Sequence, residues 1–182
     1  MTTRRIGVTA LLLACLSAAS AAQDSLKLTI QSVELTHPVQ GNITISLLLP
    51  EGAQRHKDGL LWTSRDGSFN FHLQVVAEPE VKDQGRRIDI YDRALKSSSD
   101  DFTVTTSKGV HRVGTTKVPC LSWERIPKKA DERFQPNLGL MVAGPRSSFT
   151  LTCLANSQAS FAKHRKSLKR VAESLNIVRK AR

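Results

Sequence analysis

The stretch SFTLTCLANSQASFAKHRKSLKRVAESLN, residues 148–176, carries the strongest fold signals of this 182-residue chain. Its first part alternates apolar and polar residues and predicts a strand over 149–154. Asn156 and Ser157 then supply helix-capping side chains. The stretch therefore predicts a strand leading into an amphipathic helix of about four to six turns. The apolar stripe of this helix comprises Phe161, Leu168, Val171, Ala172 and Leu175, and Val178 extends it.

The residues before this stretch predict a mostly antiparallel sheet. Short alternating runs are separated by turn signals, of which Arg65-Asp66-Gly67 is the clearest. Residues 88–95 are expected to form a short helix that covers the sheet. The expected strands are 25–35, 43–49, 60–64, 68–77, 102–106, 109–115, 118–126, 138–143 and 149–154.

Several phrases along the chain resemble PsbP-like domains. They are Leu49-Pro50-Glu51-Gly52, Pro136-Asn137-Leu138-Gly139-Leu140, Ser148-Phe149-Thr150-Leu151-Thr152-Cys153 and Val171-Ala172-Glu173-Ser174-Leu175-Asn176-Ile177. The resemblance implies an α+β fold, an α/β/α sandwich with a mostly antiparallel sheet closed by a long C-terminal helix. It also implies a mostly non-catalytic role in assembly, subunit stabilisation or partner binding. Some exported bacterial relatives are lipoproteins or immunity proteins against secreted toxins. No family site residue is carried over.

The first 22 residues have the pattern of a secretory signal peptide. A basic head with Arg4 and Arg5 precedes the short apolar run 6–13, and Ser20-Ala21-Ala22 supplies a cleavage site. The apolar run is shorter than the roughly 20 residues that span a bilayer. We expect a single mature domain over 23–182, exported to the periplasm, with residues 179–182 frayed. An alternative is that Leu12-Leu13-Ala14-Cys15 is a lipobox and Cys15 is lipidated, which would make the protein an envelope lipoprotein.

Two cysteines remain in the mature chain, Cys120 and Cys153. In an oxidising compartment such a pair predicts a disulfide, which would stabilise the fold by roughly 3–4 kcal/mol. The alternative is a catalytic thiol, which requires a lowered pKa and a neighbouring base. No Cys-x-x-Cys motif and no histidine close in sequence supports that alternative.

Positive charge is concentrated at the C-terminal end. The chain has a formal charge of +11, and residues 162–182 contain eight basic residues and the single acid Glu173. Export and the lack of aromatic residues among the basic ones argue against nucleic acid as a partner. Lys163, Lys166 and Arg170 share one helix face, either as a solvated surface or as a surface that steers an acidic protein or an anionic envelope surface.

The candidate partner-binding residues are Lys163, Lys166, Arg170, Trp123, Lys128 and Lys129. Lys128 and Lys129 fall in an expected exposed loop, and Trp123 is either a core residue or a partly exposed anchor. No metal site is predicted, because the five histidines lack zinc-site spacing. No catalytic residue or cofactor is predicted, because the sequence has no Gly-x-Ser-x-Gly elbow and no phosphate loop.

These observations predict a non-catalytic, exported protein-binding domain of the bacterial envelope. An immunity protein that neutralises a periplasm-targeted toxin is one form, and an assembly or stabilising factor is another. Two alternatives stay open. One is an envelope hydrolase whose site is not recognisable from sequence, and the other is an envelope-anchored structural lipoprotein.

Overall fold

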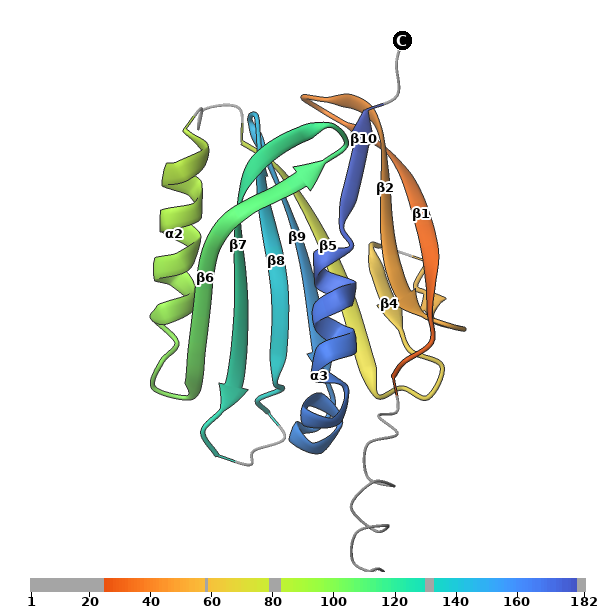
Figure 1. The fold of residues 1–182 in the computed structure, drawn as a ribbon, viewed down its shortest axis with the longest axis vertical. Helices are drawn as coiled ribbons and strands as arrows, with labels where there is room; N and C mark the ends of the chain where they lie inside the picture. Colours follow the sequence, from red (N-terminus) through yellow and green to blue (C-terminus); the bar gives the residue numbers. More distant parts are fainter. Residues whose placement is uncertain (1–24, 58, 79–82, 130–132, 180–182) are drawn as a thin grey trace, which may run out of the picture.

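The computed structural model describes residues 25–57, 59–78, 83–129 and 133–179 (Figure 1). The strands of these residues form two antiparallel sheets. The smaller sheet has the order β1-β2-β10, with β1 (Leu28–His37), β2 (Gly41–Pro50) and β10 (Asn176–Arg179). The larger one has seven strands in the order β3-β4-β5-β9-β8-β7-β6. They are β3 (Gln54–Arg55), β4 (Leu61–Thr63), β5 (Phe69–Ala77), β6 (Phe102–Val113), β7 (Thr116–Pro127), β8 (Asn137–Gly144) and β9 (Ser147–Ala155).

Helix α3 (Gln158–Glu173) begins and ends where serine side chains replace the helix's own hydrogen bonds. Ser157 caps the N-terminus by accepting from the Ser160 amide. At the other end the Ser174 hydroxyl donates to Val171 O at 2.6 Å and accepts from the Leu48 amide of β2 at 2.7 Å. These bonds stop the helix and direct the chain into β10. The predicted stripe is buried against β8, β9 and β2, with Leu168 fully inaccessible.

Helix α2 (Gln84–Lys96) covers the opposite face of the seven-stranded sheet, over β6, β7 and β8 (Figure 1). It starts four residues before the predicted helix, because the Asp83 side chain caps it by accepting from the Arg86 amide. Ile88 and Leu95 pack on this face of the sheet. One helix therefore packs on each face of the seven-stranded sheet, and apolar residues of β2 join the core on the α3 side.

The α+β fold with antiparallel sheets is confirmed, and two local predictions are corrected. Residues 102–113 form one continuous strand, β6, where the sequence predicted a break after Thr106. Val178 belongs to β10 and not to the helix, because Ile177 pairs with Ile45 of β2 and Val178 pairs with Thr44. The segment expected to continue the helix is thus an edge strand of the smaller sheet.

The predicted disulfide is wrong. Cys120 and Cys153 are both free thiols. Cys120 lies on β7 and Cys153 on β9, with β8 between them. Two strand spacings amount to roughly 10 Å, and a disulfide requires Cα atoms within about 7 Å. Burial raises the pKa of both thiols, most strongly at the completely buried Cys153, so neither is activated as a nucleophile.

Candidate functional site

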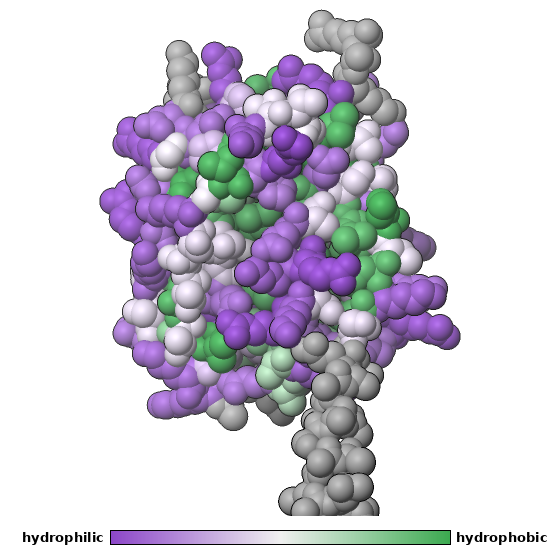
Figure 2. All heavy atoms as spheres, viewed as in Figure 1, coloured by the Kyte–Doolittle hydropathy of each residue, from purple (hydrophilic) through white to green (hydrophobic). Residues whose placement is uncertain are grey.

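The outer face of α3 is the predicted basic surface. Lys163, Lys166 and Arg170 are exposed, as are Arg165 and Lys169 on the neighbouring side of the helix. Figure 2 shows hydrophilic side chains gathered over α3 on this face of the molecule. Among the residues that the structure describes, Lys166 and Arg170 have no acidic side chain within ion-pairing distance. Their charges are therefore available to an incoming anionic group.

Lys128 and Lys129 lie at the end of β7 next to the start of α3. The Gln158 side chain donates to Pro127 O at 3.0 Å, which joins the first residue of α3 to the last residue of β7. Both lysines are exposed. The structure therefore brings the basic residues of two distant sequence segments to neighbouring positions.

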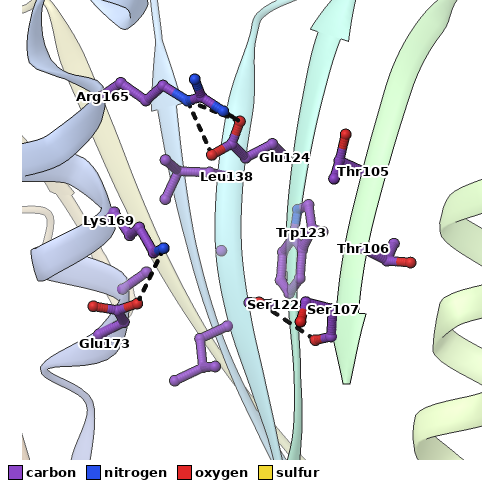
Figure 3. Close-up of a pocket in the computed structure, with 13 residues that line it drawn as sticks. Thr105, Thr106, Ser107, Ser122, Trp123, Glu124, Leu138, Arg165, Lys169 and Glu173 are labelled. Atoms are coloured by element: carbon purple, nitrogen blue, oxygen red, sulfur yellow. Dashed lines mark hydrogen bonds and ion pairs between the residues drawn. The ribbon is translucent and has the colours of Figure 1, made fainter. Parts of the chain in front are cut away.

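A groove of about 160 Å³ lies beside this basic surface (Figure 3). It forms because α3 packs over β8 and β9 and leaves the same face of β6 and β7 uncovered. Its apolar lining comes from Leu138, Leu140 and Ala172, and the hydroxyl-bearing side comes from β6 and β7 with Ser107 and Ser122. The groove thus has an apolar floor and polar walls.

Two ion pairs flank the groove. Arg165 of α3 reaches across to Glu124 of β7, with Nε 3.1 and 3.0 Å from the two carboxylate oxygens and Nη2 2.6 Å from one of them (Figure 3). This bidentate hydrogen bond raises the pKa of Arg165. Lys169 and Glu173 form the second pair at 3.8 Å within α3. The first pair fixes the helix to the sheet, and the second is looser.

Trp123 is a core residue and not the partly exposed anchor that was one of its two predicted roles. Its side chain faces α2, where Tyr91 packs at a ring-centroid distance of 5.5 Å and Asn137 Oδ1 accepts from the indole N–H at 3.2 Å. Only 4% of the residue is exposed. The ring lies over Gly139, the position of β8 directly opposite. Trp123 is therefore a buried side chain, and it is also among the residues that line the groove (Figure 3).

The groove is lined by hydroxyl, carboxylate and amino groups, and its two carboxylates, those of Glu124 and Glu173, are ion-paired. The Ser122 hydroxyl donates to the backbone carbonyl of Ser107 at 3.3 Å, and no histidine or cysteine is among the lining residues. In the described part of the chain, no group of three or more His, Cys, Asp or Glu side chains is placed to hold a metal ion. Cys15, the predicted lipidation residue, lies outside the described residues.

The described helices include none that is both long and apolar enough to cross a bilayer.

The sequence interpretation missed Glu124, Arg165 and Lys169 as site residues. Arg165 and Lys169 are four residues apart on α3, and this spacing signals a shared helix face. Glu124 precedes Arg165 by 41 residues, and no local pattern indicates their contact.

Comparisons with protein-family models and with curated protein sequences gave no match. Comparison with solved structures matched the solution structure of cyanobacterial PsbP (CyanoP) from Synechocystis sp. PCC 6803. The two chains are 14% identical and superpose with a TM-score of 0.53 over 82% of this chain and 93% of CyanoP. The chain therefore has the PsbP-like fold that its sequence phrases predicted, and the likeness is one of fold.

Proposed function

We propose that this protein is a non-catalytic protein-binding domain of the bacterial envelope that captures an acidic partner on the outer face of α3. The observation that carries the proposal is the set of exposed basic side chains on one rigid helix, with Lys166 and Arg170 unpaired among the described residues. A helix anchored by a buried apolar stripe holds these charges in a fixed array. Such an array discriminates partners by their charge.

The proposed binding is controlled mainly through the rate of association. An exposed ion pair contributes only about 0–1 kcal/mol, because water and salt screen it. The same charges accelerate encounter with an oppositely charged surface. An immunity protein that neutralises a periplasm-targeted toxin and a factor that assembles or stabilises an envelope complex both fit this behaviour.

The test compares two double variants with the same change in charge. Lys166→Glu with Arg170→Glu reverses the α3 surface, and Arg112→Glu with Lys117→Glu reverses an exposed basic pair on the β6–β7 hairpin. A partner recovered from envelope extract and purified should associate more slowly with the first variant at low salt, and the difference should fade as salt is added. Equal association rates for the two variants would refute the proposal.

The compartment is proposed from residues 1–22, which support export to the periplasm. Amino-terminal sequencing of the native protein should find Gln23. The lipoprotein form instead predicts palmitate incorporation that is lost in Cys15→Ser. An uncleaved amino terminus on a cytosolic protein would refute both forms.

A further inference from the structure

We propose that the groove beside α3 receives a single aromatic or large aliphatic side chain of the acidic partner segment. This inference rests on the proposed function and adds the kind of residue that the partner must supply. The groove measures about 160 Å³. A cavity of about 150 Å³ in a protein core accommodates benzene, so one phenyl group is the size that fits.

The chemistry of the groove agrees with its size. Leu138, Leu140 and Ala172 are each no more than 3% exposed and form an apolar floor beneath the opening. The side chains that surround this floor include hydroxyls and ion-paired groups, which already have partners within the protein. An apolar side chain would gain contact with the floor without separating the Arg165–Glu124 pair.

The basic surface adjoins the groove. It therefore determines that the partner residues on either side of the apolar one are acidic. Lys166 and Lys169 are three residues apart on α3 and are therefore surface neighbours, and Lys169 lines the groove. Arg170 follows on the outer side of the helix. A segment crossing α3 would thus place acidic residues against Lys166 and Arg170 and an apolar residue over the groove. The geometry points to an acidic segment interrupted by one large apolar residue.

The experiment uses short synthetic peptides rich in glutamate that carry either phenylalanine or alanine at the centre, with glutamine-rich versions as neutral probes. Association and dissociation rates are measured on the purified protein. The phenylalanine peptide should dissociate about tenfold more slowly than the alanine peptide, the change expected from burying most of one aromatic side chain. Their association rates should agree, since the charges are the same.

Ser122→Leu supplies the decisive variant, because a leucine at this position fills the groove from β7. It should abolish the difference between the phenylalanine and alanine peptides and leave the association rates unchanged. Ser32→Leu on β1 is the matched control, since Ser32 also sits on a strand and also loses one side-chain hydrogen bond, to Ser46. The control should retain the tenfold difference.

The outcomes separate this inference from the proposed function. Salt-dependent binding of the acidic peptides with equal dissociation rates overturns the groove inference and leaves the charge-based function standing. A tenfold difference that survives in Ser122→Leu also overturns the groove inference. Acidic and neutral peptides that associate equally slowly with the wild-type protein overturn both.

Discussion

Replacing Gly139 by alanine tests how tightly β8 is packed against the Trp123 indole of β7 and the backbone of β9. A Cβ atom built at this position would lie 2.3 Å from Cζ2 of Trp123 and 2.5 Å from the backbone oxygen of Leu151. Both distances are far inside van der Waals contact. The carbonyl belongs to the neighbouring strand β9 and cannot rotate away, so the indole or the strands themselves must move.

The cost can be assembled from these contacts. Overpacking a buried site costs about 1–3 kcal/mol. Moving the indole also breaks its hydrogen bond to Asn137, which adds about 1 kcal/mol. A loss of about 2–4 kcal/mol lowers the melting temperature of a domain of this size by roughly 5–15 °C, at 2–4 °C per kcal/mol.

The assay is thermal unfolding followed by far-ultraviolet circular dichroism, with Gly109→Ala as the matched control. Gly109 also sits in a strand of the same sheet, but its added Cβ would lie 3.7 Å from the Cys120 sulfur, an ordinary contact. That variant should melt at or slightly above the wild-type temperature, because alanine loses less entropy than glycine on folding. If Gly139→Ala and Gly109→Ala melt at the same temperature, the close packing of Gly139 against Trp123 and Leu151 is refuted.

Three further outcomes follow from the structure. Side-chain hydrogen bonds from Ser64 and Ser68 lower the pKa of Asp66 to about 2 from 3.8, so its stabilising effect is complete above pH 3.8 and is lost as the pH falls through about 2. In urea unfolding, Asp66→Asn should therefore be less stable than wild type at neutral pH, and the difference should shrink as the pH falls and vanish below about pH 2; a constant difference would contradict this. Thiol titration of the denatured, unreduced protein without residues 1–22 should count two free thiols. A count of zero would show that Cys120 and Cys153 form the disulfide after all. Leu168→Ala should cost about 2–5 kcal/mol in the same urea assay, and a loss below 1 kcal/mol would place Leu168 outside the core.

The sequence predicted those elements whose signals are local. The start of α3 followed from the Ser157 cap and the spacing of Phe161 and Leu168, and the hairpin at Asp66-Gly67 followed from its turn residues. The end of α3 could not be predicted from the sequence, because Val178 fits both the apolar stripe of a helix and a strand. Pairing of β10 with β2, more than a hundred residues earlier, decides between them.

The residues of the candidate site were likewise predicted only where the sequence signal is local. Exposure of Lys163, Lys166 and Arg170 followed from the helix pattern. The position of Trp123 did not, since alternation along β7 separates Trp123 from Ser122 and Glu124 but does not show that α2 covers the face on which Trp123 lies. The prediction of a disulfide between Cys120 and Cys153 failed for a related reason. Alternation cannot say that β8 lies between the strands of Cys120 and Cys153.

The groove exists because the two faces of β8 have different neighbours. Toward α2, Gly139 has no side chain, and the Trp123 indole occupies the place that a Cβ would take. Toward α3, Leu138 and Leu140 lie beneath a helix that follows β8 and β9 and does not extend over β6. The Trp123 side chain thus packs one face at the same level at which the other face stays open. The open face is bordered by α3, on which Lys166 and Arg170 have no ion-pair partner among the described residues, so capture by charge and insertion of a side chain would occur on one helix.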